Sequence, residues 1–259
     1  MSLTDGIIGC WSPSIRGSGY LLPDLSGRGN HGVLTNMDAG TDWPGAAVRG
    51  THGRVVDYDG SNDYTDCGLR LNAALVDKLT ISMWAVFRTR NAVIVPISNL
   101  SAGADNGFAL EMGRTANKLT WLQNGATVDA TSTGSITDAD WHHVVVARNG
   151  TTGSWTITFA IDGVISTHIT SANPAAASSS GILAIGRYGS YTGGFNFNGQ
   201  IGEVTIYQRA LPEAEIRDLF RQGNGAIGRQ LTGQTRRRVY GFVPSTGARR
   251  RRILCGGNC

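Results

Sequence analysis

The pattern of hydrophobic and polar positions divides this chain into short segments that glycine-rich turns separate. Residues 79–89 alternate two sets of side chains and the second set is also partly apolar, so this segment predicts a central strand covered on both faces. An apolar run that ends at Asp59-Gly60 predicts a hairpin within residues 54–68. Further strands are predicted at 6–12, 107–113, 118–123, 141–148, 154–162 and 182–187. Short strands at this spacing predict an all-β fold, a two-sheet antiparallel jelly-roll sandwich.

Residues 201–222 combine a last strand with a different periodicity. The run 201–207 reads as a strand, and an amphipathic segment follows it after a turn. Pro212 suits the first position of a helix, and Gly223 suits its end. Three apolar side chains would share one face of this helix, namely Ile216, Leu219 and Phe220. We therefore predict one short C-terminal helix that packs on the sandwich.

Composition agrees with this assignment. Charged residues make up 16% of the 259 residues, below the usual quarter, and 36 residues are glycine. A chain of this length can fold as a single all-β domain with a sizeable core. Cys10 and Cys67 lie in strand-like runs, where we expect buried thiols.

The charge is divided unevenly along the chain. Its net value is +4, but no acidic residue follows Asp218, whereas nine arginines do. Since the whole chain has 23 basic and 19 acidic residues, the first 220 residues carry 14 basic against 19 acidic side chains. A mildly acidic body with a basic end suggests an interaction segment. We therefore divide the chain into a sandwich domain, 1–222, and an extended arginine-rich arm, 223–259.

The arm combines charge with apolar side chains. Arginine favours bidentate contact with carboxylate or phosphate groups, and interleaved apolar residues would anchor the arm in a protein groove. We expect it to dock on a protein in preference to nucleic acid. The predicted partner-binding residues are Arg236, Arg237, Arg238, Tyr240, Phe242, Arg249, Arg250, Arg251 and Arg252.

Two negative observations bear on localisation. The N-terminal residues show no secretory signal pattern, and no apolar run approaches the roughly 18 residues needed to span a bilayer. We expect a protein that is made in a cytoplasm, is not bound to a membrane, and is released by lysis.

Five motifs carry a resemblance to a known family. The segments DLSGRGNHGVL, YDGSNDYTDCG, LTISMWAVF, DADWHHVVVAR and FNGQIGEVTIYQRALPEAEIRDLF follow one another in the order seen in laminin G-like domains of the concanavalin A-like lectin/glucanase superfamily. The resemblance covers about residues 5–222 and implies the jelly-roll sandwich. The opening GIIGCWSPS and the following residues are also similar to small stand-alone laminin G-like proteins of tailed phages.

The resemblance implies a structural calcium site and leaves function open. Related domains often hold Ca²⁺ between an N-terminal loop and the last strand, which here implies Asp24, Asn30 and Glu203 as ligands, with no other cofactor required. The chain departs from the family at Gly202, where Asp commonly precedes the Glu. Alternatively, Asp24 and Asn30 only shape a turn.

Aromatic residues near 187–199 offer a second candidate site. Tyr188, Tyr191, Phe195 and Phe197 lie among Gly and Asn residues, a combination that suits a carbohydrate-binding rim, an oligomer contact or a plain loop. In the family, the His142-His143 pair begins a hairpin strand, which implies rings that pack or bond to neighbouring loops. The paired glutamates of a glucanase strand do not occur, so we predict no catalytic residues and no enzyme.

These features lead to one functional expectation. We expect a non-enzymatic virion structural protein of a tailed phage, most specifically a capsid decoration protein that displays a lectin-like sandwich and is anchored to capsid or other virion proteins by its arm. We also expect it to form a homo-oligomer. The alternatives are a tail or fibre adhesion component, a free lectin that binds cell-surface glycans, and a glycoside hydrolase that uses an aspartate pair.

Overall fold

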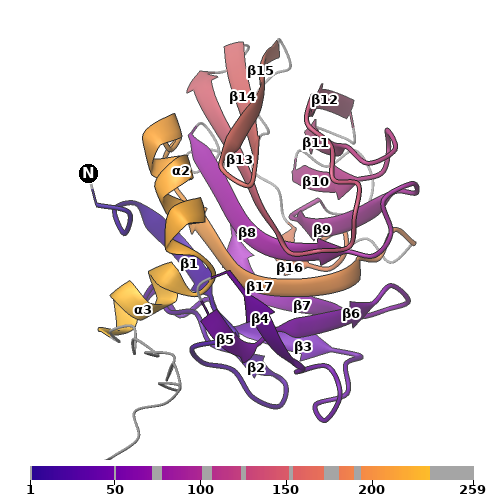
Figure 1. Ribbon diagram of the computed structural model, residues 1–259, viewed down its shortest axis with the longest axis vertical. Helices are drawn as coiled ribbons and strands as arrows, with labels where there is room; N and C mark the ends of the chain where they lie inside the picture. The colour runs from indigo at the N-terminus through magenta and orange to yellow at the C-terminus, as the bar shows by residue number, and fades with distance from the viewer. Residues whose placement is uncertain are drawn as a thin grey trace, which may run out of the picture.

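Two antiparallel sheets pack face to face in the computed structural model, as Figure 1 shows. The structure describes residues 2–49, 51–71, 78–100, 107–123, 127–151, 154–171, 181–189 and 194–233. The predicted all-β sandwich is therefore confirmed.

The first sheet has seven strands and contains the predicted central strand. In spatial order it holds β1 (Ile7–Trp11), β17 (Asn198–Tyr207), β8 (Leu79–Phe87), β13 (His142–Thr151), β14 (Ser154–Ile161) and β15 (Val164–Ser171), and β6 (Val56–Asp59) also pairs with β17. Every residue of β8 is buried, because the core covers one face and the C-terminal helices cover part of the other. The two-sided apolar pattern of residues 79–87 thus predicted its position correctly.

The second sheet has eight strands and forms the other wall of the core. Its order is β12 (Thr127–Thr131), β11 (Leu119–Gln123), β10 (Phe108–Met112), β9 (Ile94–Ser98), β16 (Ile182–Ile185), β7 (Tyr64–Arg70), β3 (Gly32–Thr35) and β2 (Leu21–Leu22). A separate small hairpin consists of β4 (Gly45–Val48) and β5 (Thr51–Arg54). The core between the two large sheets includes the stacked rings of Phe108 and Trp121, and Cys67 is buried there as a free thiol, as expected.

Two helices cover the outer face of the seven-stranded sheet (Figure 1). Helix α2 (Glu213–Gln222) ends at Gly223, as predicted, and buries Ile216 and Leu219. Pro212 is its N-cap, one position before the predicted first helical position. Phe220 stacks on Trp84 of β8 with a centroid separation of 5.9 Å. Within the described residues, no helix is long and apolar enough to cross a membrane.

A second helix, α3 (Ala226–Thr232), was not predicted. It begins beyond the predicted domain boundary at 222, and Ala226, Ile227, Gly228 and Arg229 are buried in it. The start of the predicted extended arm is therefore a packed part of the fold. Strands β2, β4, β5, β9 and β12 were also missed. The hairpin predicted within residues 54–68 is wrong, because β6 and β7 lie in different sheets.

Candidate functional site

The aromatic residues that the sequence offered as a carbohydrate-binding rim differ in their exposure. Phe197 is fully buried and packs edge-on against Tyr58 and Phe87, so it belongs to the core. Tyr188 is also buried, and Phe195 alone among the described members is exposed, with 47% of its surface accessible. Tyr191 lies outside the described residues. Of the three alternatives for this segment, a carbohydrate-binding rim therefore cannot include Phe197 in its contact surface and leaves Tyr188 largely covered.

Tyr188 completes a polar cluster on the outer face of the eight-stranded sheet. Its hydroxyl donates to the fully buried carboxylate of Glu111, which also accepts two bonds from the Arg114 guanidinium at 2.6 and 3.0 Å. Burial, followed by the contact with Glu111, raises the pKa of Tyr188. The Tyr188 ring meets that of Phe195 edge-on at 5.7 Å. The Tyr188 ring therefore packs against Phe195, while the Glu111 carboxylate has no access to solvent.

Phe195 is held in an unusual backbone conformation. Its φ is +66°, and Gly194 before it has φ +70°. A bulky residue in the left-handed region costs about 1–3 kcal/mol and persists only where its surroundings hold it. Here the Phe195 carbonyl accepts a bond from the Val95 N–H at 2.9 Å, and the Asn196 amide donates to the Ser61 carbonyl. These two bonds hold the strained segment and keep the aromatic ring of Phe195 exposed.

Asp24, the first predicted calcium ligand, is fully engaged by the protein. One of its oxygens accepts from the N–H groups of Cys10 and Ser26, and the other accepts from the Ser26 hydroxyl and the Asn30 N–H. The Asn30 side-chain amide donates to the Ile8 carbonyl at 3.2 Å. These bonds fasten the loop at residues 24–30 to β1, which agrees with the turn-shaping alternative.

Glu203 binds a helix through both of its oxygens. One oxygen accepts from the Ile227 N–H at 3.1 Å and the other from the Gly228 N–H at 2.7 Å, both in the first turn of α3. The carboxylate is buried, and burial raises its pKa despite these bonds. The backbone N–H of Glu203 donates to the Asn224 side chain at 2.7 Å. We call this arrangement the α3 clasp.

Two glycines allow the close approach that the α3 clasp requires. A Cβ atom at Gly202 would lie 2.5 Å from the Asn224 side-chain oxygen, and one at Gly228 would lie 3.1 Å from a Glu203 oxygen. The missing side chain of Gly202 leaves room for Asn224 and α3.

These residues do not fit a calcium ion. Ca²⁺ takes six to eight oxygen ligands whose lone pairs face the metal, but the oxygens of Asp24 and Glu203 already accept N–H and O–H groups that would repel a cation. Across the described part of the chain, no group of three or more His, Cys, Asp or Glu side chains could hold a metal ion. In place of the expected ligand set, Glu203 holds the root of the arm.

The histidine pair has structural contacts. His142 is bonded to Asp162 at 2.8 Å and to Asp138 at 2.9 Å, and these carboxylates, with Asp162 first, raise its pKa. His143 is fully buried, bonds to the Ser82 hydroxyl at 2.9 Å, and packs against Trp84. Its burial lowers its pKa to about 3. The implied contacts are thus divided between the two rings: His142 bonds to neighbouring loops, and His143 packs and bonds against β8.

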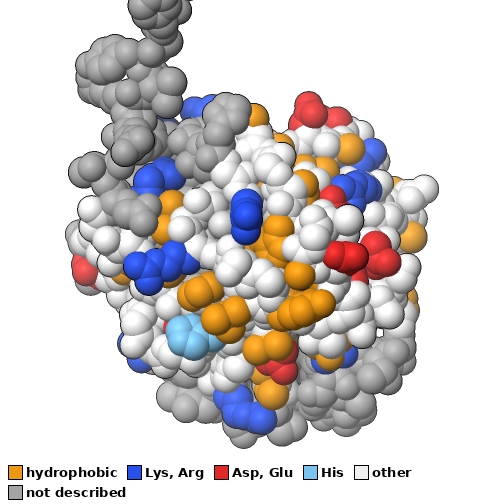
Figure 2. Space-filling view, turned by 90° about the horizontal axis from the view of Figure 1, so that it is seen from below, with side chains coloured by type: hydrophobic (Ala, Val, Ile, Leu, Met, Phe, Trp, Pro, Cys, Tyr) orange, Lys and Arg blue, Asp and Glu red, His pale blue; other side chains and the backbone are white. Residues whose placement is uncertain are grey.

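An exposed apolar surface lies where β2 and β3 end the eight-stranded sheet. Leu21 and Val33 are directly paired across these strands, and both are about half exposed, as is Tyr20. Figure 2, which views the molecule from below, shows apolar side chains gathered on this side with charged groups around them. Successive side chains in a strand point to opposite faces of the sheet. Leu22 is buried, so Leu21 beside it points outward. Sequence reasoning missed this surface, since the segment has too few residues to reveal an alternation.

The predicted partner-binding arginines, with Tyr240 and Phe242, lie outside the described residues. The α3 clasp is therefore the part of the arm whose contacts the structure defines.

Comparison with known proteins identifies the fold family. A family model described as the concanavalin A-like lectin/glucanases superfamily matches residues 59–217, which is more than half of the chain. No protein with a curated description matches in sequence.

Solved structures give likenesses of fold. A Trypanosoma rangeli sialidase mutant with trans-sialidase activity is 14% identical with a TM-score of 0.56, and the match covers 88% of this chain but 34% of the sialidase. Domain 4 of AbnA, a GH43 arabinanase from Geobacillus stearothermophilus, in complex with arabinotriose, is 16% identical with a TM-score of 0.56 and coverage of 82% and 97%. The binding domain of Paraclostridial Mosquitocidal Protein 1 is 15% identical with a TM-score of 0.58 and coverage of 85% and 52%.

The family model and these structures agree with the sandwich of two antiparallel sheets described above. The chain belongs to the concanavalin A-like lectin/glucanase superfamily.

Proposed function

We propose that this protein is a non-enzymatic structural protein in which the sandwich faces outward and the arginine-rich arm attaches it to a larger assembly. The observation that carries the proposal is the α3 clasp, because it fixes the point from which the arm leaves the sandwich. A fixed root lowers the entropy lost when the arm docks. The arm's arginines then supply bidentate contacts to carboxylates on a partner.

The absence of enzymatic activity in this proposal is supported by the state of the glutamates. A glycosidase needs a pair of carboxyl groups that flank the bond to be broken. Each glutamate of this chain is instead bound by the protein itself: Glu111 by Arg114 and Tyr188, Glu203 by α3, Glu213 by Arg217, and Glu215 by Arg209.

The specific assembly in this proposal is the virion of a tailed phage, with the protein decorating the capsid. Its support is the similarity of the N-terminal segment to small phage laminin G-like proteins, together with the basic arm. A place in the tail or fibre is the alternative within the same class. The exposed apolar surface of Tyr20, Leu21 and Val33 supports the further proposal that copies associate.

The test compares the full chain with one that stops after Gly233, so that α3 and its clasp are retained. We expect the shortened protein to keep its thermal midpoint and to lose co-sedimentation with phage particles. A variant with Arg249, Arg250, Arg251 and Arg252 changed to Gln should lose association, and the matched change to Lys should lose less. Full association of the shortened protein would refute anchoring by the arm.

Glycan binding is a second candidate function, and the exposed Phe195 ring favours it. Aromatic rings offer sugars a flat apolar face, and a domain of similar fold is known in complex with arabinotriose. Glycan-array binding should disappear in Phe195→Ala. The control is Val164→Ala, since Val164 is an exposed apolar residue on β15. An array without any signal, or equal loss in both variants, would exclude this function.

A further inference from the structure

A depression lined by both charged and apolar groups lies where the chain passes from β17 to α2. Its volume is about 500 Å³, within the range of small-molecule sites. The lining residues are Lys78, Asn149, Arg209, Ala210, Pro212 and Glu215. Lys78 directly precedes β8, Asn149 lies near the end of β13, and the other residues lie in the connection into α2 and in its first turn. The lining includes neither Phe195 nor residues of the arm.

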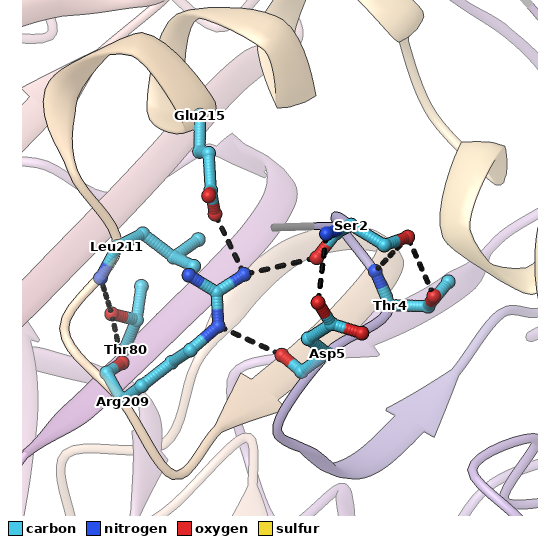
Figure 3. A network of polar contacts seen from close by, with 7 residues as sticks. All are labelled: Ser2, Thr4, Asp5, Thr80, Arg209, Leu211 and Glu215. Carbon is cyan, nitrogen blue, oxygen red and sulfur yellow. Dashed lines mark hydrogen bonds and ion pairs between the residues drawn. The ribbon is translucent and has the colours of Figure 1, made fainter.

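Arg209 is held in place on one side and free on the other (Figure 3). Its Nε donates to the Asp5 carbonyl at 2.8 Å, and its Nη2 donates to the Ser2 carbonyl at 3.2 Å and pairs with Glu215 at 2.6 Å. Among the described residues, no contact uses its Nη1. A guanidinium fixed in this way can bind a ligand without losing side-chain entropy.

The connection that carries Arg209 is itself fastened to β8. The Thr80 hydroxyl donates to the Arg209 carbonyl at 2.7 Å and accepts from the Leu211 N–H at 2.9 Å, as Figure 3 shows. Thr80 and Leu211 are buried, so these bonds are shielded from water. The wall of the depression is therefore formed before any ligand arrives.

The charges of the lining define the chemistry of a ligand. Lys78 and the free side of Arg209 would bind one carboxylate through charge-assisted hydrogen bonds. Glu215 would repel a second negative charge but can accept hydroxyl groups, and the Asn149 amide can both donate and accept. We propose that this depression binds a singly charged, polyhydroxylated carboxylate, that is, an acidic sugar residue.

The test measures binding of glucuronate to the full chain by calorimetry at low ionic strength. Glucose tests the need for the carboxylate, and phosphate tests whether any small anion binds. We expect saturable binding of glucuronate, and affinities at least about tenfold weaker for glucose, which lacks the carboxylate. Lys78→Ala and Asn149→Ala should each weaken glucuronate binding, the first about tenfold. Lys118→Ala is the matched control, because Lys118 is the only other lysine in the chain.

A second measurement uses the unaltered protein and so does not depend on whether the variants fold. Bound glucuronate should slow chemical acetylation of Lys78 and leave Lys118 unaffected. Absence of saturable binding, equal affinity for phosphate, or equal effects at both lysines would overturn the assignment. Since Phe195→Ala and removal of the arm should leave glucuronate binding unchanged, failure here is distinguishable from failure of either proposed function.

Discussion

Glu203→Gln tests the α3 clasp with the smallest possible change of shape. Glutamate accepts the N–H groups of Ile227 and Gly228 with its two oxygens. Glutamine has one oxygen and one NH₂ group, so one of these N–H groups would face another donor. Because both N–H groups are buried with the carboxylate, water cannot take over the lost bond.

The expected cost follows from two opposing effects. A hydrogen bond to a charged group contributes about 1.5–3 kcal/mol, and a buried unpaired N–H costs about 1–3 kcal/mol. Against this, glutamine avoids the burial of a charge, a penalty that the raised pKa of Glu203 reports. We expect the loss of bonding to exceed the relief, with a net cost of about 2 kcal/mol.

This cost should fall on α3 and spare the sandwich, because α3 is short and lies after the last strand. The assay is amide hydrogen exchange at Ile227 and Gly228, where a cost of about 2 kcal/mol corresponds to a roughly 30-fold loss of protection. Amides of β17 beyond the clasp should keep their protection. The control is Glu213→Gln, which alters an exposed ion pair with Arg217 and should change little. Unchanged protection in Glu203→Gln would refute the clasp.

Three further changes test other contacts. The pKa of His142 is raised in the folded state, so the stabilisation that this group provides is present below the pKa of the unfolded chain and is lost as the pH rises through the folded-state pKa. His142→Gln should therefore reduce the difference in thermal midpoint between pH 6 and pH 8. Tyr188→Phe should cost about 1.5–3 kcal/mol in urea unfolding, since it removes a bond to the buried Glu111 carboxylate, and a cost near zero would contradict that bond. Gly202→Ala should cost about 1–3 kcal/mol by displacing Asn224, seen as faster exchange in α3, and wild-type exchange would show that the space is available.

The sequence was informative where local pattern and tertiary structure agree. The two apolar faces of residues 79–87 predicted β8, and Pro212 and Gly223 predicted both ends of α2. In each case the signal lies within the element itself. A strand that is covered on both faces has apolar side chains on both, and residues such as Pro212 and Gly223 mark the ends of a helix.

Helix α3 could not be predicted because its stability comes from outside it. A helix of seven residues with Gly228 inside is marginal alone, since nucleation is costly and glycine disfavours helices. Its first-turn N–H groups are satisfied by Glu203, a residue far away in sequence. Strand β9 was hidden by Pro96, a residue rare within sheets, which is accommodated beside a register shift between β9 and β10.

The candidate sites were misjudged where one residue type serves two kinds of contact. A carboxylate accepts N–H groups as readily as it binds calcium, so Asp24 and Glu203 suited both readings. The signal that separates them was Gly202, whose missing side chain admits Asn224. Likewise, the left-handed backbone at Gly194 and Phe195 breaks the alternation that would have shown Phe197 to be buried.

Strand β17 and the residues just after it fasten both ends of the described chain. Within the strand, Glu203 holds α3, and just beyond its end, Arg209 holds the N-terminal residues Ser2 and Asp5. The two sets of hydrogen bonds share no residue, but Leu3, Leu211 and Ile227 pack in one hydrophobic cluster on the outer face of the sheet. Residues that share packing partners couple in energy. The root of the arm and the depression are therefore positioned by the same strand and by the same packed cluster.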